Sequence, residues 1–297
     1  MKRAASYTLG AAVAAAFSAV AVILLLPLVS DLTMIGALVA GGIYLASHVL
    51  RACRLMLLAT DILGLSGRSA ALMHFATAPL ALILPFKTGE LFRLYELWRL
   101  SGTAVYALIA LLIDRMYDSL FLVPVLLVLL SQGGAPTTLT LLTLLIAALP
   151  LTIVVIGPKL LTELQRYILV NHNSRRTLSL LQQIDALRVI VARASDVALR
   201  RAPELSLLSF LIWLSEFLVC LILVNAVAGQ ALELLGARLV APWWDLGVDP
   251  VAGPALALVT IALLLPWPLM VFLYLKRRRN EPRRVPAAGR AELRVIP

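Results

Sequence analysis

The chain has 297 residues, of which 61% are hydrophobic and only 14% are charged, and its mean hydropathy is +0.95. This composition excludes a soluble globular domain and predicts an all-α, polytopic integral membrane protein, because a helix satisfies its own backbone hydrogen bonds in lipid. The formal net charge of +10 fits anionic lipid and membrane topology. No nucleic-acid motif accompanies it, so nucleic acid is not an expected partner.

Neither the cysteines nor the histidines form a recognisable chemical site. Cys53 and Cys220 lie in separate apolar stretches, where a thiol behaves as a small hydrophobe, so no disulfide is expected. The three histidines have no cysteine or carboxylate at ligand spacing. We therefore expect no metal, no cofactor and no catalytic residues.

Six apolar segments are predicted to span the membrane, and a seventh is predicted to enter it without crossing. A span needs about 20 apolar residues. The predicted spans are residues 4–29, 32–59, 103–130, 139–156, 205–228 and 251–275, and the re-entrant segment is 69–86. Residues 159–204 are expected to form one or two amphipathic helices on the cytoplasmic leaflet, and residues 276–297 a basic cytoplasmic tail. Residues 1–275 thus form a single transmembrane domain.

Charge distribution distinguishes the re-entrant segment from a true span. If all seven segments crossed, the basic stretch 159–201 would lie on the opposite side from the basic N-terminus, against the positive-inside rule. If residues 69–86 instead enter and leave on one face, both termini are cytoplasmic, and of the 26 Lys and Arg only Arg238 lies outside. Pro79 and Pro85 within this segment also favour a broken element over a straight span.

The most informative motif follows directly, because residues 84–93 read LPFKTGELFR. Pro85 and Gly89 break the chain, so a new helix is expected to begin near Gly89 with Glu90 in its first turn. Four charged residues then recur at intervals of three and can pair along one helix face: Glu90, Arg93, Glu96 and Arg99. Two interpretations are open. The helix is an amphipathic connector at the headgroups, or Lys87 and the first two of these charges mark the mouth of a polar cavity.

A second charged motif lies inside the next apolar segment, where residues 114–118 read DRMYD. Asp114 and Asp118 share a helix face, and Arg115 can reach Asp118. Asp114 lies eleven residues into its segment, or about 16 Å, which is near the midplane of a hydrocarbon core about 30 Å thick. These charges are either structural ion pairs with Arg51 or Arg54, or a site for a lipid headgroup or a coupled proton. Both arginines lie near the predicted cytoplasmic end of their span, from where they can also snorkel.

Residues 51–54 (RACR), together with the two charged motifs, resemble the transmembrane, flippase-like domain of lysylphosphatidylglycerol synthases and the stand-alone relatives of that domain. The family pattern is Leu-Pro-x-basic-x-Gly-Glu-x-x-Arg, then Glu-Arg-x-x-Asp in the next helix, and the likeness covers residues 45–120. Asp114 stands where the family usually has Glu. A second Gly-rich re-entrant element of the relatives has no counterpart, and residues 241–245 (APWWD) resemble an interfacial anchor instead. No stretch matches the soluble aminoacyl-transfer domain, so lipid lysylation is not expected.

The resemblance implies a protein that binds or translocates a lipid with an anionic headgroup, a phospholipid or a polyprenyl phosphate. The expected location is the cytoplasmic membrane of a bacterium or archaeon. Two alternatives are a non-catalytic scaffold that partners a lipid-modifying enzyme, and a glycosyltransferase using a polyprenyl-phosphate sugar, with Asp31 as its carboxylate. Pro85 and Gly89 are assigned structural roles. The residues predicted to meet the headgroup are Arg51, Arg54, Lys87, Glu90, Arg93, Asp114, Arg115 and Asp118.

Overall fold

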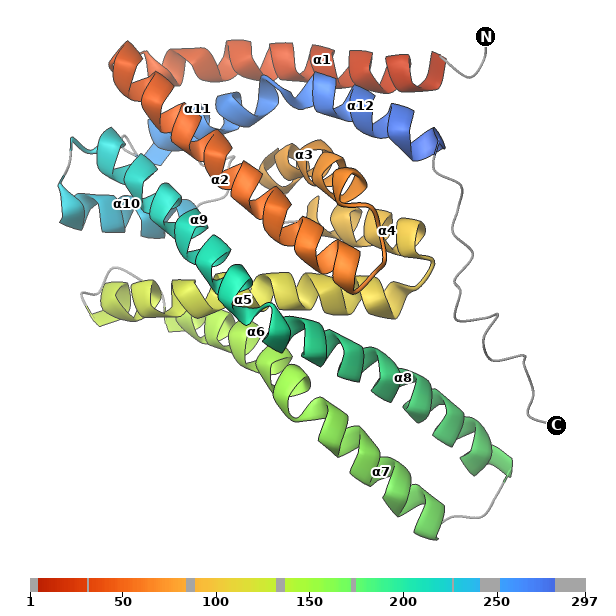
Figure 1. The fold of residues 1–297 in the computed structure, drawn as a ribbon. Coiled ribbons are helices and arrows are strands. Elements are labelled where there is room, and N and C mark those ends of the chain that lie inside the picture. The colour runs from red at the N-terminus through yellow and green to blue at the C-terminus, as the bar shows by residue number, and fades with distance from the viewer. Residues whose placement is uncertain are drawn as a thin grey trace.

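Helices account for nearly all of the chain that the computed structural model describes, which is residues 5–30, 32–83, 89–131, 137–171, 175–225, 227–240 and 252–280 (Figure 1). Within these ranges there are no strands, so the prediction of an all-α chain is confirmed. The elements are α1 (Ala5–Leu25), the 3-10 helix η1 (Leu26–Val29), α2 (Met34–Asp61), α3 (Gly67–Ile83), α4 (Gly89–Ser101), α5 (Ala104–Ser131), α6 (Thr137–Val155), α7 (Gly157–Asn171), α8 (Arg175–Arg200), α9 (Ala202–Leu223), α10 (Ala228–Val240), α11 (Ala252–Leu264) and α12 (Trp267–Asn280).

Three helices are long and apolar enough to cross a membrane: α1 extended through η1, α2 and α9. The number rises to five if the bent pairs 147–171 and 253–279 each count as one span. The helix α5 is 28 residues long but carries Asp114, Arg115 and Asp118 in its middle, so it is not among these three apolar helices. The described chain therefore contains three to five candidate spans. The expectation that Pro79 breaks its segment was wrong, because α3 is a continuous helix through it.

Local breakers lie where consecutive helices bend or end. The segment predicted as one span at 251–275 bends by 40° between α11 and α12, where Pro266 removes a backbone donor. The α6–α7 pair bends by 57° at Gly157 and Pro158. Asn225 has a φ of 53°, a left-handed conformation that Asn tolerates and that commonly ends a helix. It follows α9, and the separate helix α10 begins three residues later, which the sequence analysis did not predict.

The outer face of the first helix is unusually apolar and exposed. Four of its large side chains are between 62% and 70% exposed: Leu9, Val13, Ile23 and Leu24. A soluble protein rarely leaves a continuous apolar face of this kind open to water. The face is what contact with lipid tails requires, and it supports integration of the chain into a membrane.

The helix α2 lies at the centre of the fold, where it packs most extensively along α9 and also contacts α3, α5 and α11 (Figure 1). The helix α1 lies along α12, and α5 lies along α6. A buried cluster joins α2, α5, α8 and α9 through side chains that include Leu58, Ile113, Ala194 and Leu205. The stretch 159–204, expected as one or two helices, forms the pair α7 and α8, which extends from the rest of the bundle in Figure 1.

Candidate functional site

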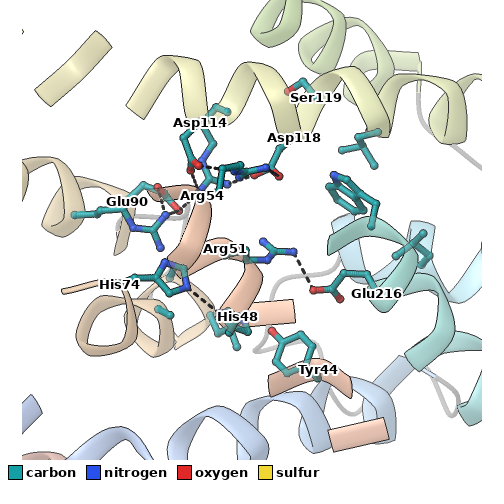
Figure 2. Close-up of a pocket in the computed structure, with 18 residues that line it drawn as sticks. Tyr44, His48, Arg51, Arg54, His74, Glu90, Asp114, Asp118, Ser119 and Glu216 are labelled. Carbon is teal, nitrogen blue, oxygen red and sulfur yellow. Dashed lines mark hydrogen bonds and ion pairs between the residues drawn. The ribbon is translucent and has the colours of Figure 1, made fainter. Parts of the chain in front are cut away.

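A polar cavity of about 350 Å³ lies among α2, α3, α4, α5 and α9 (Figure 2). The charged residues that line it are Arg51, Arg54, Glu90, Arg93, Asp114, Arg115, Asp118 and Glu216, and they are joined by His48, His74, Tyr44, Ser119 and Trp213. The structure thus brings all the predicted headgroup residues that it describes to one cavity. Lys87 and Pro85 lie outside the described residues, as does Asp31.

One wall of the cavity is a closed ring of two arginines and two aspartates. Arg54 donates from Nε to Asp114 Oδ1 at 2.8 Å and from Nη1 to Asp118 Oδ1 at 2.7 Å. Arg115 donates from Nη2 to Asp114 Oδ2 at 3.1 Å and from Nη1 to Asp118 Oδ2 at 3.0 Å. All four carboxylate oxygens therefore accept a charge-assisted hydrogen bond. Arg54 is only 1% exposed and also donates to Ser209 Oγ on α9 at 2.7 Å.

The burial of Arg54 corrects one expectation. Its guanidinium does not snorkel toward the membrane surface but turns inward, because the aspartates on α5 and Ser209 on α9 offer acceptors inside the bundle. The structural ion pair that was one of the two interpretations of the second motif is therefore present for Arg54. Arg51 does not pair with these aspartates; it forms an ion pair with Glu216 instead.

The helix α4 delivers a second set of charges because it is packed tightly against α3. It begins at Gly89 as predicted, and a Cβ there would lie 2.6 Å from the backbone carbon of Leu80 and closer still to the backbone of Ala81. Glycine is thus required for the close approach. In the next position, Glu90 turns toward the cavity and lies 3.2 Å from Arg115 Nη2 through its Oε1.

The pair Glu90 and Arg93 is looser than the aspartate ring. Arg93 Nη1 lies 3.3 Å from both carboxylate oxygens of Glu90, at the long end for a charge-assisted bond. Although burial opposes ionisation of Glu90, the guanidiniums of Arg115 and Arg93 outweigh it and hold the pKa of the carboxyl below its usual value. Glu90 is therefore an anion at neutral pH.

The predicted ladder of charges on α4 divides into two halves. Its first half faces the cavity through Glu90 and Arg93, whereas Glu96 pairs with Arg99 at 2.7 Å and accepts a bond from Tyr274 of α12 at 2.5 Å. Glu96 also lies 3.2 Å from Arg278 Nη1. Arg93 and Glu96 are both buried, so one half of the ladder lines the cavity and the other half contacts α12.

The far side of the cavity carries a carboxylate that the sequence analysis missed. Glu216 on α9 accepts from Arg51 Nη2 at 2.9 Å and from Ser47 Oγ at 3.3 Å. Figure 2 shows Arg51 and Glu216 pointing toward one another, with His48 and His74 side by side nearby; His48 Nδ1 lies 3.3 Å from His74 Nε2. A single carboxylate inside the apolar segment 205–228 is itself a signal of function, and it could have identified Glu216.

Several polar atoms of the cavity lining have no hydrogen-bond partner among the described residues. They are Arg51 Nε, Arg93 Nε, Arg115 Nε, Trp213 Nε1 and His74 Nδ1, and all are buried. The arginine and indole atoms can only donate, and no carboxylate oxygen is in the set. These donors therefore point to no acceptor of the described chain although carboxylates line the same cavity, and buried donors without acceptors are costly. An incoming group that is rich in acceptor oxygens would relieve this cost.

Comparison of the chain with protein-family models, with curated proteins and with solved structures found no match. Within the described residues, no group of three or more His, Cys, Asp or Glu side chains is placed to hold a metal ion. The chemistry of the site therefore rests on its geometry: a charged, donor-rich cavity inside an all-helical bundle with three to five candidate membrane spans.

Proposed function

We propose that the chain is a flippase-like integral membrane protein, related to the transmembrane domain of lysylphosphatidylglycerol synthases, that binds or translocates a lipid with an anionic headgroup. The headgroup is that of a phospholipid or a polyprenyl phosphate. The observation that carries the proposal is the cavity of about 350 Å³ whose buried arginine and indole donors lack acceptors. Ionisable groups inside a membrane bundle are costly and usually mark a substrate path.

The proposal includes a topology of six spans and one re-entrant segment. In it α5 crosses the membrane despite its three charges, because Asp114, Arg115 and Asp118 turn toward the cavity and pair there rather than facing lipid. The segment formed by α3 and the residues after it enters and leaves on the cytoplasmic face. Both termini are then cytoplasmic, in the cytoplasmic membrane of a bacterium or archaeon.

In this mechanism the headgroup enters the cavity while the acyl or prenyl tails remain in the bilayer. The described lining holds four arginines and four carboxylates, so excess positive charge does not explain a preference for anions. The preference arises because the arginines are incompletely hydrogen-bonded, and oxygen acceptors of the headgroup complete them. The exposed apolar face of α1 contacts the lipid tails and so stabilises the protein in the bilayer.

Native mass spectrometry of the detergent-purified protein tests this function. The wild type is compared with Arg93→Ala, which removes a donor from the cavity, and with Arg188→Ala, which removes an exposed arginine of α8 that pairs with Asp185. We expect a phospholipid or polyprenyl phosphate to remain bound to the wild type and to Arg188→Ala and to be lost from Arg93→Ala. Equal lipid retention by all three proteins would contradict the proposed function.

A scaffold role is the second candidate, and the α7–α8 pair favours it. This pair extends from the bundle (Figure 1) and leaves large apolar side chains at least 60% exposed, among them Tyr167, Val170 and Leu178. Such a surface fits a lipid-modifying enzyme as partner. A stoichiometric partner that co-purifies with the wild type, and is lost when these three residues are changed to Ser, would support the scaffold over autonomous lipid transport.

A further inference from the structure

We infer that the cavity binds one phosphate group between Arg51 of α2 and Arg93 of α4, and that Glu216 and Glu90 occupy these arginines until the phosphate displaces them. The inference deepens the proposed function and rests on it for the lipid that carries the phosphate. It also divides the charged residues into two groups with different roles. The ring of Arg54, Asp114, Arg115 and Asp118 is a wall, and the phosphate binds beside it.

The four arginines of the cavity differ in how far their donors are used. Arg54 makes three contacts of 2.7 to 2.8 Å, to two aspartates and a serine, and both terminal nitrogens of Arg115 are bonded within the ring. Arg51 instead holds Glu216 through Nη2, with its Nε unpartnered among the described residues. Arg93 holds Glu90 at 3.3 Å, also with an unpartnered Nε. Arg115 Nε is also unpartnered there, but Arg115 contacts three carboxylates, those of Asp114, Asp118 and Glu90. Within the described chain Arg51 and Arg93 each hold a single carboxylate, so they are the arginines whose donors are least used.

Two further donors face the same cavity from other helices. Trp213 Nε1 on α9 is buried and lacks an acceptor among the described residues. His74 on α3 lies 3.3 Å from His48 through Nε2, so in the tautomer that accepts there, its buried Nδ1 is a donor. Donors on α2, α3, α4 and α9 thus surround one cavity of about 350 Å³. A tetrahedral phosphate presents oxygens in several directions at once, whereas a carboxylate presents two in one plane.

The carboxylates of Glu216 and Glu90 are anions, like the phosphate group that we infer binds here. Glu216 is bonded to Arg51 and Glu90 to Arg93, each through one guanidinium nitrogen. A phosphate group offers more acceptor oxygens than either carboxylate and fits the guanidinium fork. A competing carboxylate weakens binding of an anion, so its removal strengthens binding. This direction is opposite to the loss expected if Glu216 only supported the fold.

The test is a lipid titration followed by native mass spectrometry, with the full-length protein in a non-ionic detergent. The probes are dioleoyl phosphatidylglycerol and dioleoylglycerol, which differ in the phosphoglycerol headgroup, and inorganic phosphate is titrated separately by calorimetry. The variants are Arg51→Gln, Arg93→Gln and Glu216→Gln, with Arg188→Gln on α8 as a matched control for loss of charge. Thermal unfolding of each variant reports whether it is folded.

We expect phosphatidylglycerol to bind the wild type and dioleoylglycerol not to compete. Arg51→Gln and Arg93→Gln should each weaken binding by about tenfold or more, the usual effect of losing a charge-assisted hydrogen bond. Glu216→Gln should strengthen binding several-fold, and Arg188→Gln should leave it unchanged. If an arginine variant fails to fold, the stronger phosphatidylglycerol binding expected of Glu216→Gln still tests the inference.

Three other outcomes separate this inference from the proposed function. Phosphatidylglycerol binding that is indifferent to Arg51, Arg93 and Glu216 would overturn the phosphate site while leaving lipid binding intact. Binding of inorganic phosphate with the expected variant pattern, without lipid binding, would support the phosphate site and overturn the lipid function. Weaker binding in Glu216→Gln, with unchanged thermal stability, would show that the carboxylate is part of the site and would overturn the displacement.

Discussion

Arg54 on α2 and Asp118 on α5 are joined by a contact of 2.7 Å between Nη1 and Oδ1, and both side chains are buried. Asp114 and Arg115 complete the ring around them. The ring links the central helix to the charged helix across 64 residues of sequence. Buried ion pairs of this kind add little net stability compared with apolar packing, but removal of one partner leaves an uncompensated charge.

Replacement of Arg54 by Met should therefore destabilise the protein strongly. Both aspartates would lose a donor, and Ser209 would lose its contact. We expect a loss of about 3 to 5 kcal/mol in the free energy of unfolding, the usual cost of leaving a buried charge unpaired. Denaturant unfolding in detergent measures it. Arg188→Met, at an exposed pair on α8, is the control and should change the free energy of unfolding by less than about 1 kcal/mol. Equal losses in the two variants would show that the buried ring contributes no more to stability than an exposed ion pair.

Gly89 is expected to tolerate no side chain, because α4 begins against the backbone of α3. A methyl group there would overlap Leu80 and Ala81, and both contacts are with backbone, which cannot swing aside. Gly89→Ala should cost about 1 to 3 kcal/mol, as overpacking does, and it should also weaken lipid binding by shifting Glu90 and Arg93.

Gly42 provides the matched control for this change. It lies within α2, and a Cβ there would have no neighbour within 4 Å. Gly42→Ala should leave stability unchanged or raise it by about 0.5 to 1 kcal/mol, because Ala favours the helix. Thermal unfolding of both variants, beside the lipid titration, compares them directly. Equal thermal stability and equal lipid binding of the two variants would show that the close approach of α3 and α4 does not require glycine at position 89.

Tyr274 is expected to hold α12 to α4 through Glu96. Its hydroxyl donates to Glu96 Oε2 at 2.5 Å, in a cluster with Arg99. Tyr274→Phe should cost about 1.5 to 3 kcal/mol, since the bond is to a charged acceptor. Tyr95→Phe, at a half-exposed ring on the same α4, should change unfolding by less than about 0.5 kcal/mol. A double-mutant cycle with Glu96→Gln should show a coupling that the Tyr95 variant lacks.

Much of the site follows from local periodicity, which the sequence displays. The spacing of three residues places Arg115 within reach of Asp118, and the two do pair. The start of α4 at Gly89 follows equally from a breaker and a first-turn carboxylate. These features depend on neighbours along the chain, so a single sequence is sufficient to predict them. The contact of Arg115 with Asp114, its neighbour along the chain, was not predicted.

The pairing between distant helices was predicted only in part, because the sequence offered Arg51 or Arg54 as partners of the aspartates without choosing between them. Arg51 and Arg54 are three residues apart, yet one contacts Glu216 on α9 and the other the aspartates on α5. The choice depends on how α2 packs against both helices, and no spacing encodes it. The cavity donors His74 and Trp213 were missed for the same reason: each is an ordinary residue of an apolar segment until the fold places it beside the arginines.

Glu90 should impose a pH dependence that a neutral substitute lacks. Arginines hold the pKa of its carboxyl below the usual value, so it stabilises the fold above its unfolded pKa of about 4.3. This stabilisation is lost as the pH falls through the lower, folded value. We therefore expect Glu90→Gln to be less stable than the wild type between about pH 5 and about pH 8. We expect this difference in stability to shrink below about pH 4. Unfolding of both proteins across this range measures the difference. A gap that stays constant down to about pH 3 would show that the charge of Glu90 does not provide the stabilisation.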